Sequence, residues 1–111
     1  MLAVVDAGPL YATADSDDAD HARCRAILSR ADLRLVIPAL AVAEATYFVG
    51  RRLGARAEAA FLRGLGAFDV EGPAPDDFDR IGELVERYAD LPLGATDASV
   101  IALAERIGAG S

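Results

Sequence analysis

Three short apolar runs, each followed by a stretch with helical spacing, constrain the fold of this chain more than any other feature. The runs are LAVVD (2–6), DLRLVIP (32–38) and FDV (68–70). Strands that alternate with helices favour a parallel sheet with helices packed on its faces. The predicted fold class is therefore α/β, a Rossmann-like parallel sheet flanked by helices. No linker or internal repeat interrupts the 111 residues, so residues 1–111 are expected to form a single domain.

Apolar spacing and terminal residues predict the helices. A short helix is expected to begin near Pro9, and a strongly apolar helix over 39–54 is expected to end at Gly54, with Arg51 and Arg52 in its last turn. Three more helices are predicted over 55–68, 76–90 and 96–108. A helix over 17–30 is expected to use Ala22, Ala26, Ile27 and Leu28 as its apolar side, and the helix over 76–90 to use Phe78, Ile81, Leu84, Val85 and Tyr88.

The charge balance limits how the chain can meet a nucleic acid. The formal charge is −7, and every basic residue is arginine. An acidic domain is a poor non-specific nucleic-acid binder, so such a role requires a bound cation or a small arginine cluster such as Arg51, Arg52 and Arg56. The single cysteine, Cys24, excludes an intramolecular disulfide, and no segment resembles a secretory signal or a membrane span. A cytoplasmic protein without membrane contact is expected.

Three carboxylates stand at positions that favour a site. Asp6 ends the first apolar run, and ligands of open parallel sheets bind at the carboxyl ends of the strands. Helical spacing predicts that Glu44 shares a face with Leu40, Tyr47 and Phe48, and that Asp97 shares one with Val100, Ile101 and Ala104. Each also has an ordinary structural interpretation: a turn residue for Asp6, a rim or arginine-paired residue for Glu44, and a helix cap for Asp97.

The three carboxylates together favour a metal site. Like charges about 5 Å apart repel by roughly 3 kcal/mol per pair at an effective dielectric of 20. A divalent cation removes that conflict, and all-oxygen ligands suit Mg²⁺ or Mn²⁺ rather than Zn²⁺. His21 and Cys24 alone cannot form a zinc site, so Cys24 is predicted to be a core residue and His21 an exposed or capping one.

The order of motifs resembles a known family. V-V-D-A-G-P-L, D-x-D-H-x-x-C, the segment from Pro38 to Glu44, and L-P-L-G-x-T-D-A-S-x-x-A-L-A-E-R follow one another along essentially the whole chain. In this order they resemble PIN-domain ribonucleases, most closely the VapC-type toxins of bacterial toxin–antitoxin pairs. The resemblance implies a PIN-like fold and a metal site formed by Asp6, Glu44 and Asp97. The family's hydroxyl residue after the first Asp is replaced by Ala7, whereas Thr96 and Ser99 flank the third acid as supporting donors.

The end of the chain departs from that resemblance. PIN domains usually continue past the A-L-A-E-R helix into a strand of the type T-L-D, whose Asp is the fourth acid. This sequence ends at Ser111, and no acidic residue follows Glu105. The C-terminal strands and the fourth carboxylate are therefore expected to be missing, which leaves an exposed sheet edge.

These features lead to one principal function and one alternative. The resemblance implies an endoribonuclease that depends on Mg²⁺ or Mn²⁺ and is the toxin of a VapBC-type pair. Asp6 and Asp97 would bind the metal directly, and Glu44 would either bind it through a water molecule or orient the attacking water. The alternative is a truncated or degenerate PIN domain that binds an antitoxin without cleaving RNA. A receiver or phosphatase domain is disfavoured because the chain has no lysine. Expected partners are RNA, a VapB-type antitoxin and a second copy, the last through part of the apolar set Tyr47, Phe48, Phe61, Leu62 and Leu65.

Overall fold

The computed structural model describes residues 1–91 and 93–108, and strands alternate with helices in it as the sequence predicts. The elements are β1 (Leu2–Val4), α1 (Ala7–Ala12), α2 (His21–Leu28), β2 (Arg34–Pro38), α3 (Ala39–Leu53), α4 (Ala55–Gly64), the short 3₁₀ helix η1 (Leu65–Ala67), β3 (Asp69–Glu71), α5 (Asp77–Arg87) and α6 (Ala95–Ile107). The predicted break at Pro92 and the predicted end of the chain at residues 109–111 lie outside the described residues.

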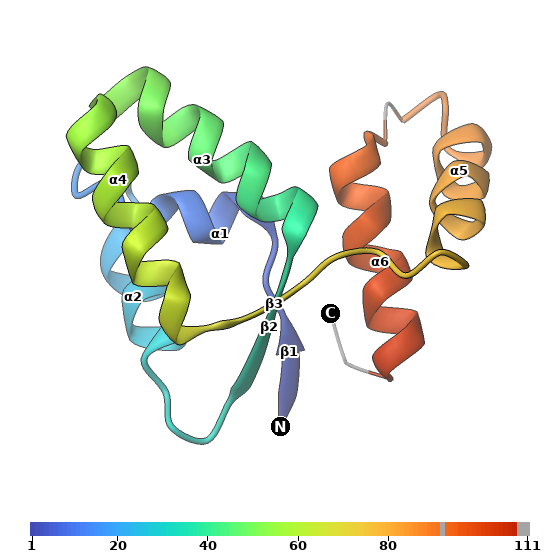
Figure 1. Cartoon of the computed structure of the whole chain (residues 1–111), viewed down its shortest axis with the longest axis horizontal. Helices are drawn as coiled ribbons and strands as arrows, with labels where there is room; N and C mark the ends of the chain where they lie inside the picture. Colours follow the sequence, from blue (N-terminus) through green and yellow to red (C-terminus); the bar gives the residue numbers. More distant parts are fainter. Residues whose placement is uncertain (92, 109–111) are drawn as a thin grey trace.

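The three described strands form one parallel sheet in the order β1-β2-β3. Val4 pairs with Val36, and Val36 pairs on its other side with Asp69, so β2 is the middle strand. Its residues Val36 and Ile37 are buried, as expected for a strand covered on both faces. Helices α1 to α4 lie on one side of the sheet and α5 and α6 on the other (Figure 1). The predicted α/β fold with a flanked parallel sheet is confirmed.

Two apolar clusters stabilise the two sides of the sheet. The larger joins the sheet to α1, α3 and η1 and contains Val5, Leu10, Tyr11, Ile37, Ala45, Val49 and Leu65. The smaller lies between α5 and α6 and contains Ile81, Leu84, Ala98 and Ala102. Helix α6 also contacts α3, β1 and β2, so it connects the α5–α6 pair to the rest of the domain.

Two predicted helical faces were correct only in part. On α2, Leu28 packs against the larger cluster as predicted, whereas Ala22, Ala26 and Ile27 are exposed and Cys24 is the buried residue. On α5, Ile81 and Leu84 are buried as predicted, whereas Phe78 is 59% exposed and Val85 and Tyr88 also face solvent. Both helices lie at the periphery of the fold and are covered along a narrow stripe only, which helical spacing alone cannot locate.

The predicted helix over 55–68 is interrupted by its glycines. Helix α4 ends at Gly64, and η1 follows as a single tight turn around Gly66. Glycine lowers helix stability by about 1 kcal/mol relative to alanine, and 3₁₀ turns are frequent at the C-termini of α-helices. The predicted end of α3 is confirmed: Gly54 follows it with φ of 90°, and Arg51 and Arg52 lie in its last turn. Within residues 1–91 and 93–108, no helix combines the length and the apolar character needed to cross a membrane.

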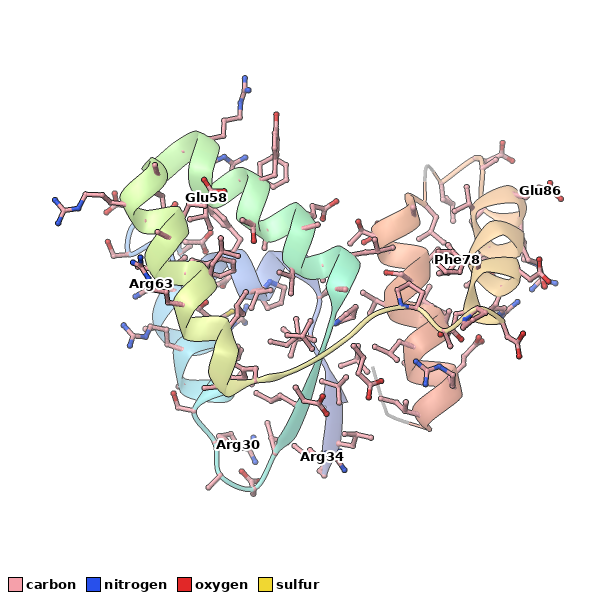
Figure 2. The ribbon with its side chains drawn as sticks, in the orientation of Figure 1. Arg30, Arg34, Glu58, Arg63, Phe78 and Glu86 are labelled. Carbon is pink, nitrogen blue, oxygen red and sulfur yellow. The ribbon has the colours of Figure 1, made fainter. Side chains whose placement is uncertain are left out.

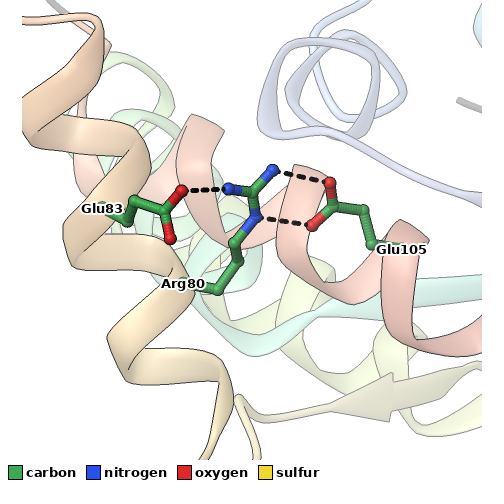
Figure 3. Close-up of polar contacts among 3 residues, drawn as sticks. All are labelled: Arg80, Glu83 and Glu105. Carbon is green, nitrogen blue, oxygen red and sulfur yellow. Dashed lines mark hydrogen bonds and ion pairs between the residues drawn. The ribbon is translucent and has the colours of Figure 1, made fainter.

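Charged side chains join α5 to α6. The Arg80 guanidinium donates two hydrogen bonds of 2.8 Å to the carboxylate of Glu105 and a third to Glu83 (Figure 3). This contact lowers the pKa of Glu105 and raises that of Arg80. At the start of α5, one turn before Arg80, the buried Asp77 accepts hydrogen bonds from the Arg106 Nε–H of α6 and from the Ala74 backbone N–H. The orientation of α6 is thus held by polar contacts as well as by the smaller apolar cluster.

Candidate metal-dependent nuclease site

Asp6 lies where the first strand ends and α1 begins. The Val5 N–H donates to the Val36 carbonyl at 3.0 Å, so pairing with β2 continues up to the residue before Asp6. Asp6 is the N-cap of α1, and its Oδ1 accepts a hydrogen bond from the Ala7 N–H at 2.6 Å. The side chain is half-buried. Asp6 therefore has a structural role as a helix cap, and its position at the carboxyl end of β1 is the one at which sheet ligands bind.

Glu44 lies in the second turn of α3, and the prediction that it shares a buried apolar face was wrong. The buried side of α3 is formed by Ala41, Ala45 and Val49. Glu44 is exposed, as is Tyr47, which shares its face. The small side chains of Ala41 and Ala45 allow α3 to pack closely against its neighbours, so their side of the helix is the buried one. Glu44 lies on a different side of α3 and therefore faces solvent.

Asp97 lies in the first turn of α6, and the prediction of a core-facing side chain was also wrong. The buried residues of α6 are Ala98, Ser99, Ala102, Leu103 and Ala104, whereas Asp97 is exposed. Gly94 is the N-cap residue of α6, with no side-chain capping bond. The Ser99 hydroxyl, expected to support the third acid, donates to the Thr96 carbonyl at 2.6 Å and so stabilises the first turn of α6.

The fold brings together the elements that carry these three residues. Helix α3 contacts both α1 and α6, and α6 contacts β1 and β2, so all three acids lie on mutually packed elements. Within residues 1–91 and 93–108, however, no three side chains among His, Cys, Asp and Glu lie close enough together to hold a metal ion. The predicted ligand set of Asp6, Glu44 and Asp97 therefore stays a prediction.

Asp6, Glu44 and Asp97 form no ion pair with an arginine within the described residues. Arginines form ion pairs with seven acidic residues of the described chain, namely Asp20, Asp32, Asp69, Glu71, Asp77, Glu83 and Glu105. None of these pairs, all of which lie within the described residues, involves Asp6, Glu44 or Asp97. Magnesium binds through one or two carboxylates and otherwise keeps its water, so this oxygen donor set fits a hard divalent cation.

Other side chains of α2 and of the C-terminal end of α1 have structural roles. Cys24 is buried, as predicted. His21 is half-buried rather than exposed, and its Nδ1 donates to the carbonyl of Ala12, the last residue of α1, at 2.8 Å. This contact caps the C-terminal end of α1, as the capping alternative predicted, and connects α2 to that end. The Tyr11 hydroxyl donates to Asp15 at 2.6 Å, and this hydrogen bond raises the pKa of Tyr11 and lowers that of Asp15. These contacts fix the far end of α1, the helix that Asp6 caps.

Comparison with known proteins identifies the family. A family model described as the PIN domain matches residues 3–110. The chain belongs to the PIN-domain family. This PIN domain is 31% identical over 105 residues to Ribonuclease VapC26 of Mycobacterium tuberculosis, an alignment that covers 93% of this chain and 78% of that protein. The predicted VapC-type resemblance is confirmed.

The fold of this PIN domain also matches a solved structure. The crystal structure of VapC20 of Mycobacterium tuberculosis, a sarcin-ricin loop cleaving toxin, superimposes with a TM-score of 0.86 at 21% identity. The match covers 98% of this chain and 85% of that one. At this level of identity the similarity shows a shared fold, and it agrees with the sheet and helix order described above.

Proposed function

We propose that this PIN domain is a divalent-metal-dependent endoribonuclease and the toxin of a VapBC-type pair. The observation that carries the proposal is the set of three carboxylates, Asp6, Glu44 and Asp97, left without arginine partners on packed elements at the carboxyl end of the sheet. The similarity to Ribonuclease VapC26 supports RNA as the substrate.

In the proposed reaction, Asp6 and Asp97 would hold Mg²⁺ or Mn²⁺, and Glu44 would orient the attacking water. A bound divalent cation lowers the pKa of water and neutralises charge that develops on the phosphate. In-line attack forms a new P–O bond and breaks the P–O bond to the departing ribose, whose oxygen takes up a proton. Because Asp6 uses Oδ1 to cap α1, its position is fixed before a ligand binds.

An RNA cleavage assay with and without Mg²⁺ tests this proposal. Asp6→Asn should reduce cleavage to the rate seen in the presence of a chelator. Asp79→Asn is the matched control, since Asp79 is an exposed acid on α5 that forms no ion pair within the described residues. Cleavage that survives both the chelator and Asp6→Asn would show that the activity does not use this site.

A second candidate function is a PIN domain that binds an antitoxin without cutting RNA. The described residues contain no ready three-ligand metal group, which favours this alternative. Calorimetric titration with Mg²⁺ separates the two, because millimolar or weaker binding favours the inactive form.

In either case the proposed partner is a VapB-type antitoxin. A cavity of about 540 Å³ between α1, α2 and α4, whose lining includes Leu28 and Phe61, offers an apolar surface for it.

Self-association also stays a proposal. Of the apolar set expected at a homodimer interface, Phe48, Phe61 and Leu65 pack in or against the larger apolar cluster. Leu62 on α4 is 45% exposed and Tyr47 on α3 is 58% exposed. The exposed apolar surface available for a dimer interface is therefore smaller than the sequence predicts. Leu62 is the aliphatic residue of the set that is exposed enough to contact a second copy.

A further inference from the structure

The exposed face of α3 continues from Glu44 to two side chains suited to nucleic-acid contact. Glu44, Tyr47 and Arg51 follow one another at intervals of three and four residues, so they lie in one row along the helix. All three are exposed, on the side opposite Ala41, Ala45 and Val49. The row spans two helical turns, or about 10 Å.

The Tyr47 ring is held in place although more than half of it faces solvent. It meets the ring of Phe48 edge-on, with centroids 5.4 Å apart and an interplanar angle of 72°. Phe48 packs against the larger apolar cluster, and the Arg52 guanidinium lies over its ring at 4.8 Å. Arg51 Nη1 donates to the Tyr47 hydroxyl at 3.4 Å. An aromatic ring fixed in this way loses little conformational freedom when a base stacks on it.

Three arginines lie toward the end of this row, although the whole chain carries −7. Arg23, Arg30, Arg34, Arg80 and Arg106 form ion pairs with acidic side chains. In the described part of the chain, Arg51, Arg52 and Arg56 form none, and they flank Gly54 at the junction of α3 and α4. An arginine without a carboxylate partner remains available to a phosphate.

We infer that the Tyr47–Arg51 row of α3 binds unpaired RNA beside the proposed cleavage site, with Tyr47 stacking on a base and Arg51 contacting a phosphate. This inference rests on the proposed function and adds to it two residues that would contact the RNA. The bases of a duplex are stacked on each other and offer no face to a protein ring, whereas the bases of loops and single strands do. The row begins at Glu44, so an RNA strand bound along Tyr47 and Arg51 would continue to the proposed acidic site.

Binding measured without cleavage tests the inference. Fluorescence anisotropy of labelled short oligo(A) and of a short RNA duplex is recorded in EDTA for the wild type and for Tyr47→Ala, Tyr47→Phe and Arg51→Ala. Phe78→Ala is the matched control for Tyr47→Ala, since Phe78 is 59% exposed and lies on α5, on the other side of the sheet from α3 (Figure 1; Phe78 is labelled in Figure 2). Arg87→Ala is the control for Arg51→Ala, because both are exposed arginines in the last turn of a helix.

The expected results follow from the stacking and charge terms. Tyr47→Ala should weaken oligo(A) binding by about 5- to 150-fold, and Tyr47→Phe should keep the wild-type affinity within about twofold. Arg51→Ala should reduce the slope of log affinity against log salt by about 0.7. Duplex RNA should bind more weakly than oligo(A) and should be insensitive to Tyr47→Ala. Equal affinities for Tyr47→Ala and Phe78→Ala, or an unchanged salt slope for Arg51→Ala, would overturn the inference.

The same variants distinguish RNA from a second copy of the chain as the occupant of this face. Light scattering should give the same mass for the wild type and Tyr47→Ala, and a change from dimer to monomer would overturn the inference. Failure of the proposed function gives a different pattern, namely no Mg²⁺-dependent cleavage while the binding differences in EDTA persist. Failure of the inference alone leaves cleavage and its dependence on Asp6 intact while all variants bind oligo(A) equally.

Discussion

The buried carboxylate of Asp77 is predicted to be the polar contact that most stabilises the α5–α6 pair, and with it the helix that carries Asp97. Asp77 is 7% exposed and accepts hydrogen bonds from the Ala74 N–H at 2.8 Å and the Arg106 Nε–H at 2.9 Å. It joins the loop before α5 to the last turn of α6. Asp77→Ala removes both bonds and leaves Arg106 with Glu71, 3.6 Å away, as its remaining partner.

The magnitude follows from the two bonds. A hydrogen bond from a buried backbone N–H to a carboxylate contributes about 1.5–3 kcal/mol. The Arg106 side chain is 38% exposed, so its ion pair is screened and contributes about 1 kcal/mol or less. Asp77→Ala should therefore lower the free energy of unfolding by about 2–4 kcal/mol, a large share of the stability of a domain of this size. Urea denaturation followed by circular dichroism measures it as a lower midpoint at constant slope.

Asp79→Ala is the control for this experiment. Asp79 lies in the same first turn of α5, so both substitutions remove one negative charge from the helix N-terminus, worth about 0.3–1 kcal/mol. Asp79 is exposed and has no side-chain partner within the described chain. The difference between the variants thus isolates the two hydrogen bonds. If both variants unfold within about 0.5 kcal/mol of each other, the Asp77 contacts do not stabilise the fold as argued.

Two further predictions concern pH and backbone conformation. The Arg80 guanidinium holds the pKa of Glu105 below its usual value, so its stabilisation is fully present above the unfolded pKa of about 4.3 and is lost as pH falls through the lower folded value. At neutral pH, Glu105→Gln should unfold at a lower urea concentration than the wild type. The difference between the two urea midpoints should shrink as the pH is lowered, and a difference that stays constant would contradict a stabilising role for the Arg80–Glu105 contact. Gly54 has φ of 90°, so Gly54→Ala should destabilise by about 1–3 kcal/mol, whereas Gly64→Ala, at φ of −65° with open space around it, should stabilise by up to about 1 kcal/mol. Melting temperatures that shift in the same direction for the two variants would contradict this prediction.

The order and type of the elements could be predicted because they depend on local pattern. The apolar runs ending at Asp6, Pro38 and Val70 correspond to the three parallel strands, with boundaries shifted by at most two residues. Gly54 ends α3 as expected, since its backbone conformation is one that few other residues adopt. These features are encoded within a few neighbouring residues, so they are visible before any tertiary contact is known.

The orientation of side chains on peripheral helices could not be predicted in the same way. Apolar spacing placed Glu44 and Asp97 toward the core, yet both are exposed, because alanines form much of the buried side of α3 and α6. The hydrophobic effect rewards the burial of large side chains, but close approach of helices to a sheet favours small ones. Which face of α3 is buried depends on the elements that pack against the helix. The Tyr47–Arg51 row is therefore visible as one exposed surface only in the tertiary structure.

Residue order is enough to predict the α/β class, the position of Asp6 at a strand end and the family resemblance. Which acids pair with an arginine and which remain free depends, for the long-range pairs, on how the helices pack. Arg80 and Glu105 are 25 residues apart and Arg106 and Asp77 are 29 apart, and each pair forms because α5 and α6 pack together. Asp6, Glu44 and Asp97 remain unpaired for the same reason: in the described part of the molecule, the fold places every arginine ion pair elsewhere.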